Sequence, residues 1–123
     1  MSRSPQRILV IDDNVDITTS LRLLLQALGH DVRVAQDGPR ALVIARDYQP
    51  ELVFLDLGLP RMDGYEVSRQ LRTLPNGPAM KIIALTGWGD AQARELSAAA
   101  GFDQHWLKPI AINELRRYFD STD

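Results

Sequence analysis

Three carboxylates stand at the ends of two short apolar runs in this sequence. Asp12 and Asp13 follow Arg7–Ile11 (RILVI), and Asp56 follows residues 52–55 (LVFL). Runs this short and rich in β-branched residues predict strands that are buried on both faces. If the two strands are neighbours in a parallel sheet, the carboxylates converge at one edge, where mutual repulsion raises their pKa values. A divalent cation removes that repulsion, and an oxygen-only ligand set suits Mg²⁺ better than zinc.

A hydroxyl and an ammonium group are predicted at the ends of two further strands. Thr86 follows residues 81–85 (KIIAL), and Lys108 follows Gln104–Leu107 (QHWL). Both groups could bind the oxygens of a phosphoryl group on Asp56. Metal, ammonium and hydroxyl together would neutralise the charge that develops during in-line phosphoryl transfer. Polar groups on four strand ends together are much harder to obtain by chance than any one of them.

Each of these residues also has an ordinary structural explanation. Asp12 and Asp13 could cap the following helix, because Asp is a good N-cap and acids favour the first helical turn. Asp56 could be a loop acid, since Asp is common in turns. A Thr at a strand end is usually a cap, and a lysine is usually solvated.

Predicted strands and helices alternate along the whole chain. Leucines recur at helical spacing up to Gly29, and Asp37 and Pro39 favour the start of a second helix, which Pro50 ends. We predict strands at 7–11, 32–35, 52–55, 81–85 and 104–107, further helices at about 65–74, 90–100 and 112–119, and a turn at 75–78. This alternation predicts an α/β fold whose parallel five-stranded sheet is covered on both faces. In the order 2-1-3-4-5, the first and third strands are neighbours.

The composition excludes several function classes. The 123 residues fit one domain, 1–123, with a core at about 7–119. Fourteen basic against sixteen acidic side chains give a net charge of −2, so we expect no direct binding of nucleic acid. Cysteine is absent, which excludes disulfides and thiolate chemistry. The sequence shows no signal peptide and no apolar run of roughly 20 residues, so we expect a cytoplasmic location and no membrane association.

Four pieces of this sequence resemble the receiver domains (CheY-like) of bacterial two-component response regulators. They are the pair Asp12-Asp13, the segment LVFLDLGLPRMDG around Asp56, the LTG step at Thr86, and Lys108-Pro109. The resemblance covers about residues 7–119 and implies a flavodoxin-like (βα)5 doubly wound sandwich in the order 2-1-3-4-5. It also implies that Asp56 accepts a phosphoryl group from a phosphohistidine, forming an acyl phosphate. The donor would be a sensor histidine kinase or a histidine phosphotransfer domain.

The same resemblance implies a magnesium site. Asp13 and Asp56 would bind Mg²⁺ directly, together with the backbone carbonyl of Gly58, and Asp12 would act mainly through water. In the family, the positions of Gly58 and Trp88 tune the rate of dephosphorylation. Lys108 would contact the phosphoryl oxygens.

Further residues would form the switch. Thr86 would move toward the new phosphate, and Gly87 would keep the approach to Asp56 open. The bond from Lys108 to Pro109 is expected to be cis, as in the family. The family couples the hydroxyl residue to an aromatic residue three positions before the lysine. Here that position holds His105, a departure that puts the usual aromatic rotation in doubt.

The resemblance implies a signalling switch that catalyses only its own phosphorylation and dephosphorylation, rather than an enzyme in the usual sense. Its output partner is unknown, and it could dimerise on phosphorylation through the last helix–strand–helix face. Only residues 120–123 follow Phe119, so we expect either a single-domain regulator or a receiver cut from a longer protein, such as a hybrid sensor histidine kinase.

Two other function classes remain as alternatives. A metal-dependent phosphohydrolase generally needs a second carboxylate about two residues beyond its nucleophile, and Gly58 holds that position here. A nucleotide- or flavin-binding domain would need a glycine-rich loop after the first strand, where Asp12-Asp13 would instead repel phosphate.

Overall fold

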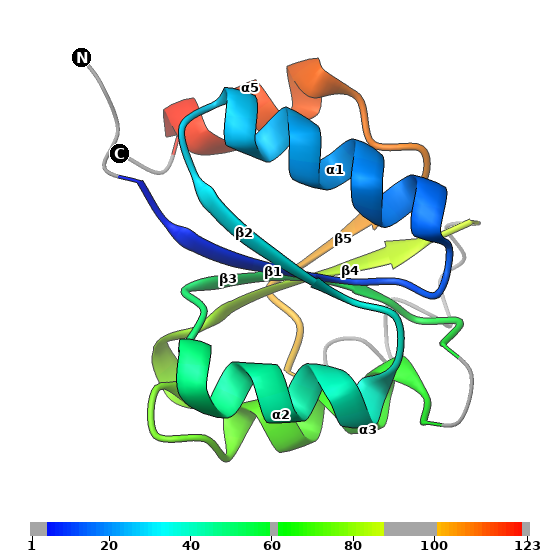
Figure 1. Cartoon of the computed structure of the whole chain (residues 1–123), viewed down its shortest axis with the longest axis vertical. Coiled ribbons are helices and arrows are strands. Elements are labelled where there is room, and N and C mark those ends of the chain that lie inside the picture. Colours follow the sequence, from blue (N-terminus) through cyan, green and yellow to red (C-terminus); the bar gives the residue numbers. More distant parts are fainter. Residues whose placement is uncertain (1–4, 60–61, 88–100, 122–123) are drawn as a thin grey trace.

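The five strands form a single parallel sheet in this computed structural model, which describes residues 5–59, 62–87 and 101–121. The strands are β1 (Arg7–Ile11), β2 (Asp31–Ala35), β3 (Leu52–Asp56), β4 (Lys81–Thr86) and β5 (Gln104–Leu107). Their order is β2-β1-β3-β4-β5, and each adjacent pair is parallel (Figure 1). The predicted sheet and its order are therefore confirmed, and all carboxyl ends of the strands meet at one edge.

Helices cover both faces of the sheet. They are α1 (Val15–Ala27), α2 (Gly38–Tyr48), α3 (Gly64–Arg72) and α5 (Ile112–Ser121), with a short 3-10 helix η1 (Gly77–Ala79). Helices α1 and α5 lie on one face, and α2 and α3 lie on the other (Figure 1). The predicted helix at 90–100 falls outside the described residues. No helix in the described ranges is long and apolar enough to cross a membrane.

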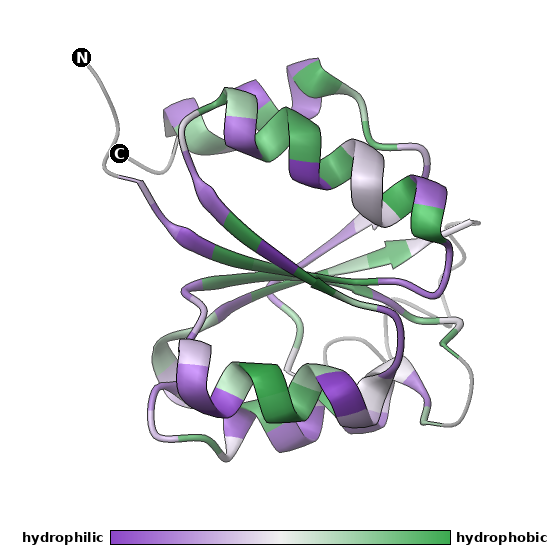
Figure 2. Ribbon diagram, in the orientation of Figure 1, coloured by the Kyte–Doolittle hydropathy of each residue, from purple (hydrophilic) through white to green (hydrophobic). Residues whose placement is uncertain are grey.

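The three central strands are almost fully buried because both of their faces pack against helices. Alternate side chains of β1 belong to opposite apolar clusters, as the two-residue period of a strand requires. Leu9 and Ile11 pack toward α2 and α3, whereas Ile8 and Val10 pack toward α1 and α5. Figure 2 shows the resulting apolar interior between more polar helix surfaces. This packing fixes the strand ends that carry the polar residues.

Glycine closes α1 as predicted, whereas the two ends of α3 differ from the prediction by one and two residues. Helix α1 stops before Gly29, whose φ of 98° suits glycine, and the N–H of Gly29 donates to the carbonyl of Gln26. Helix α3 begins at Gly64 because the Asp63 side chain caps it, accepting the N–H of Glu66 at 2.8 Å. It ends at Arg72, two residues earlier than predicted.

Candidate functional site

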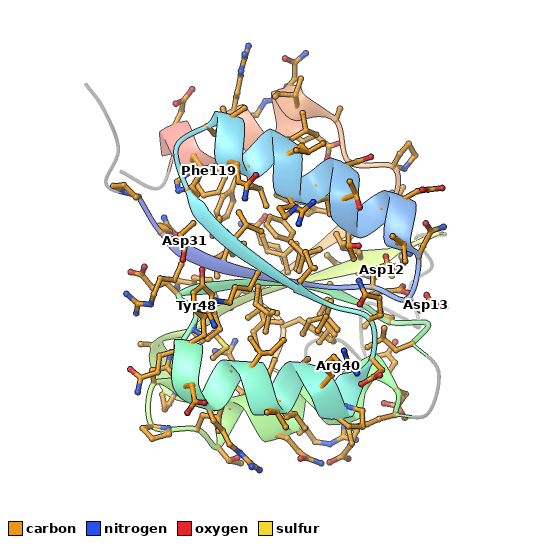
Figure 3. All side chains as sticks on the ribbon, viewed as in Figure 1. Asp12, Asp13, Asp31, Arg40, Tyr48 and Phe119 are labelled. Carbon is orange, nitrogen blue, oxygen red and sulfur yellow. The ribbon has the colours of Figure 1, made fainter. Side chains whose placement is uncertain are left out.

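The predicted acids meet at the carboxyl edge of the sheet, at the ends of β1 and β3. One carboxylate oxygen from each of Asp12, Asp13 and Asp56 lies within 4.8 Å of the others. Asp12 is 0% exposed and Asp56 is 6% exposed, whereas Asp13 is exposed to solvent. Figure 3 shows Asp12 and Asp13 together where β1 ends. The cluster therefore combines two buried acids with one that is open to solvent.

Lys108, the residue after β5, brings a positive charge into this cluster. Its Nζ lies 2.9 Å from Asp12 Oδ2 and 3.1 Å from Asp56 Oδ1. Its backbone N–H donates to the carbonyl of Thr86 at 2.7 Å, which joins the ends of β4 and β5. With its side chain only 20% exposed, this lysine is an ion-pair partner rather than a solvated surface residue.

The charges in the site do not balance. Burial raises the pKa of the Asp12 carboxyl, and the negative charge of Asp56 adds to the rise, while the N–H of Asn14 and the ammonium of Lys108 oppose it. For Lys108, burial alone would lower the pKa, but its bonds to the two carboxylates raise it overall. Within the described ranges, the three clustered carboxylates outnumber the one ammonium that contacts them, and this surplus of negative charge suits a divalent cation.

The capping explanation for Asp12 and Asp13 is wrong. Asn14 is the N-cap of α1, and its side-chain oxygen accepts the N–H of Ile17 at 3.2 Å. The backbone N–H of Asn14 in turn donates to Asp12 Oδ1 at 2.9 Å and orients that carboxylate. Asn14 is therefore a site residue that the sequence reasoning missed, although an Asn directly before a helical pattern is a standard N-cap signal.

Asp56 is the last residue of β3 rather than a loop acid. It pairs in register with Leu85 of β4, and its Oδ1 accepts the N–H of Gly58 at 3.1 Å. A side chain at Gly58 would have room, since a Cβ there would lie 3.7 Å from Asp56 Oδ1. The carboxylate is thus held from two directions, by Gly58 and by Lys108.

The residues predicted for the switch lie at the ends of β4 and β5. Thr86 is the last residue of β4 and is 9% exposed, and Gly87 next to it is exposed. The peptide bond between Lys108 and Pro109 is cis. His105 lies in β5 opposite Ala84 and is half-buried. Trp88, to which we assigned an effect on dephosphorylation, falls outside the described residues.

An apolar groove adjoins the site on the α1 side. It has a volume of about 410 Å³ and is lined by α1 residues, including Ile17 and Leu24, and by Lys108, Pro109 and Ile110. Val15, next to Asn14 on α1, is 60% exposed. Lys108 therefore borders both the acid cluster and this groove.

Comparisons with known proteins agree with this geometry. Residues 8–120 match the family described as the response regulator receiver domain. The response regulator MprA of Mycobacterium sp. (strain KMS) is 41% identical over 111 residues, which make up 90% of this chain and 47% of that protein. The chain thus spans about half the length of the curated relatives it matches.

Solved structures show the same fold. Chemotaxis protein CheY4 of Vibrio cholerae matches with a TM-score of 0.91 at 24% identity, covering 96% of this chain and 98% of that one. The receiver domain of sensor histidine kinase PA1611 from Pseudomonas aeruginosa matches with a TM-score of 0.85 at 32% identity, covering 96% and 97%. That receiver domain was solved with a magnesium ion coordinated in its active-site cleft.

Proposed function

This chain belongs to the response regulator receiver domain family, and from that premise we propose that Asp56 is its phosphoacceptor. Receiver domains are phosphorylation-dependent signalling switches of two-component systems. The observation that carries the assignment is the pair of contacts from Lys108 Nζ to the buried carboxylates of Asp12 and Asp56, at 2.9 and 3.1 Å. They put a cation beside the acid at the end of β3, where a phosphoryl group would need one.

The reaction transfers a phosphoryl group from nitrogen to oxygen. A carboxylate oxygen of Asp56 forms a bond to phosphorus while the bond from phosphorus to the donor histidine breaks, and the imidazole nitrogen leaves with the electron pair. The ammonium of Lys108 stabilises the negative charge on the transferring oxygens. The N–H of Gly58 holds the carboxylate in place during the attack. The chain catalyses only this transfer and the later hydrolysis of its own phosphate.

The acid cluster fits Mg²⁺. Its donors are oxygens only, one of its three carboxylates is open to solvent, and its charge exceeds that of Lys108. Asp13, Asp56 and the carbonyl of Gly58 would hold the ion directly, with Asp12 mainly through water. The bound ion would offset charge on the phosphoryl oxygens. The magnesium ion in the related PA1611 receiver domain supports this proposal.

Phosphorylation would act on the ends of β4 and β5. It adds about −1.5 to −2 charges at Asp56, and the new oxygens attract the hydroxyl of Thr86 and the ammonium of Lys108. Because the Lys108 N–H donates to the Thr86 carbonyl, a shift of either residue would be passed to the other at the carboxyl edge of the sheet. His105, in the strand that carries Lys108, is proposed as a further switch residue, and Gly87 keeps the approach open.

The phosphodonor would be a histidine kinase or a histidine phosphotransfer domain. Its phosphohistidine must come within bonding distance of Asp56, so its surface must cover the rim of the site. The apolar groove beside Lys108 lies on that rim and offers Ile17 and Leu24 for the contact. A phosphorylation-dependent dimer through the last helix–strand–helix face stays a prediction, which sedimentation velocity with and without phosphorylation would test.

Labelling with a small phosphodonor tests the assignment of Asp56 without the cognate kinase. Wild-type protein with Mg²⁺ and acetyl phosphate should form a covalent phosphoprotein, detected by intact mass and lost on alkaline treatment. Asp56→Asn should form none. Labelling of Asp56→Asn at the wild-type rate would refute the assignment. The phosphohydrolase alternative gains no support, because Gly58 supplies no second carboxylate.

A further inference from the structure

The start of α3 lies in direct contact with the backbone that carries Asp56. Gly64 is buried and is the first residue of α3. A Cβ at this position would lie 2.8 Å from the backbone oxygen of Asp56 and 2.8 Å from Cα of Leu57. It would also lie 3.1 Å from Cδ2 of Leu57. Two of these three neighbours are main-chain atoms, so a rotamer change cannot relieve the contact.

Helix α3 is held firmly and has little freedom to move away. Val67 and Leu71 are completely buried in the cluster beneath the sheet. The start of α2 packs tightly on Val67, since a Cβ at Gly38 would lie 2.7 Å from Val67 Cγ2. At the other end of α3, the Arg72 guanidinium donates to the carbonyls of Gly77, Met80 and Gly101. A group inserted at Gly64 would therefore displace the loop rather than the helix.

The β3 strand is also fixed, and this narrows the movable part to the loop that follows it. Asp56 pairs with Leu85, and the N–H of Leu57 donates to the carbonyl of Leu85 at 3.1 Å. The next residue, Gly58, is exposed. Gly58 is the residue whose N–H holds Asp56 Oδ1 and whose carbonyl we assign to Mg²⁺.

We propose that Gly64 is a positioning residue of the phosphorylation site, which lets α3 press on the Asp56–Leu57 backbone and so sets where Gly58 and the Asp56 carboxylate lie. The inference rests on the proposed function of Asp56, which it deepens. It assigns to the Asp63-Gly64 step a role in magnesium affinity and phosphorylation rate, in addition to starting a helix. Supporting residues of this kind typically change metal affinity by roughly 10- to 100-fold when altered.

The test compares two glycine substitutions that both bring a Cβ against backbone atoms but lie at opposite edges of the sheet, with the control position the more crowded of the two. In Gly64→Ala we expect the dissociation constant for Mg²⁺, measured by titration calorimetry, to rise roughly 10-fold or more. The rate of labelling by acetyl phosphate should fall as well, even with Mg²⁺ at saturation. Gly77→Ala is the matched control, because its Cβ would overlap the Arg72 carbonyl and lie 2.5 Å from the Leu71 oxygen. It should lower the melting temperature and leave both site measurements at wild-type values.

Each outcome decides the inference. If folded Gly64→Ala binds Mg²⁺ and labels as wild type does, Gly64 serves the fold alone and the inference is wrong. Because the substitution also destabilises, both variants and wild type are measured again with trimethylamine N-oxide, which favours the folded state. A Gly64→Ala chain still unfolded there, beside a folded Gly77→Ala, would equally overturn the inference. Wild-type protein that does not label at all would instead contradict the proposed function of Asp56.

Discussion

The two edges of the sheet use charged side chains in opposite ways. At the amino edge, Arg7 Nε donates to the carbonyls of Tyr48 and Gln49, which end α2, and Arg7 also pairs with Glu51. Arg72 likewise bonds to backbone carbonyls there and forms an ion pair with Asp103 at 2.9 Å. At that edge, Arg7 and Arg72 each form an ion pair with a separate acid. Each also donates hydrogen bonds to backbone carbonyls in segments next to the strands.

The carboxyl edge lacks this balance. Among the residues that the structure describes, Lys108 is the one cation that contacts the cluster of Asp12, Asp13 and Asp56, two of which are buried. Buried charge without a full complement of partners is costly to the fold. The difference teaches that paired charges at the amino edge serve stability, whereas the unbalanced set at the carboxyl edge suits the binding of a cation and a phosphoryl group that we propose.

The largest expected effect comes from removing Lys108, the cation in contact with the acid cluster. Lys108→Ala should slow labelling by acetyl phosphate about 10²- to 10³-fold, the usual effect of deleting a group that stabilises transition-state charge. Lys81→Ala is the matched control, because Lys81 is an exposed lysine at the start of β4 on the amino edge. Single-turnover labelling followed by intact mass measures both. Equal rates in the two variants would contradict the division between the edges.

Magnesium should stabilise the fold through the carboxyl edge alone. At a concentration 100 times its dissociation constant, an ion that binds only the folded state adds about 2.7 kcal/mol to the free energy of unfolding. Urea denaturation with and without Mg²⁺ measures this gain. Asp13→Asn should lose most of it, whereas Asp103→Asn at the amino edge should keep it. A gain that survives in Asp13→Asn would place the ion elsewhere.

Removing contacts at the amino edge should lower the stability of the fold without slowing phosphorylation. Arg72→Met removes the donor to the carbonyls of Gly77, Met80 and Gly101, and we expect a loss of about 2 kcal/mol in the free energy of unfolding. At a temperature where the variant is folded, its labelling rate should match that of wild type. A slower rate in the folded variant would mean that the amino edge also supports the reaction.

A smaller loss is expected from the hydroxyl of Tyr48. It donates to Asp31, lying 2.7 Å from Oδ2 and 3.0 Å from the backbone oxygen. Tyr48→Phe should reduce the free energy of unfolding by about 1 kcal/mol, as for one hydrogen-bonding group. Urea denaturation measures the change, and labelling by acetyl phosphate should stay at the wild-type rate.

The smallest effect is a pH dependence of stability that arises from Asp12. Its pKa is raised in the folded state by burial, with opposition from Asn14 and Lys108, so the folded chain holds this proton more tightly than the unfolded chain. The stability that the folded chain gains from this tighter proton binding is therefore fully present below the unfolded pKa of about 3.9. It is lost as the pH rises through the pKa of Asp12 in the folded state. Without Mg²⁺, Asp12→Asn should remove this fall, measured as the difference between wild-type and variant unfolding curves across pH. If wild type instead became more stable relative to Asp12→Asn as the pH rises, the ion pair with Lys108 would outweigh the effect of burial on Asp12.

The sequence predicts the sheet well because its three central strands are short, mostly apolar runs, each of which reaches a polar residue at its carboxyl end. It misplaces the ends of β3 and β4, since Asp56 and Thr86 still pair with Leu85 and Leu107 although both side chains are polar. Backbone pairing continues where hydrophobicity stops. The acid cluster follows from the strand order alone, because parallel strands bring their carboxyl ends to one edge.

Other features depend on contacts between residues far apart in the chain. The bonds from Arg72 to Gly101 span 29 positions, and nothing in the local pattern of α3 marks this arginine among the others. The crowding at Gly64 depends on how closely α3 packs on the loop after β3. The sequence Asp63-Gly64 predicts a helix start. Only the packing shows that the absence of a side chain at Gly64 lets the helix approach the backbone of Asp56 and Leu57.

The bond from Lys108 to Asp12 joins residues 96 positions apart. During synthesis, which proceeds from the N-terminus, both acids leave the ribosome long before this lysine does. A nascent or truncated chain that holds Asp12 and Asp56 but lacks β5 would therefore have no complete copy of the acceptor site that we propose. Under the proposed function, phosphorylation would be confined to chains that have folded through β5, and shorter copies would draw no phosphoryl groups away from the signal.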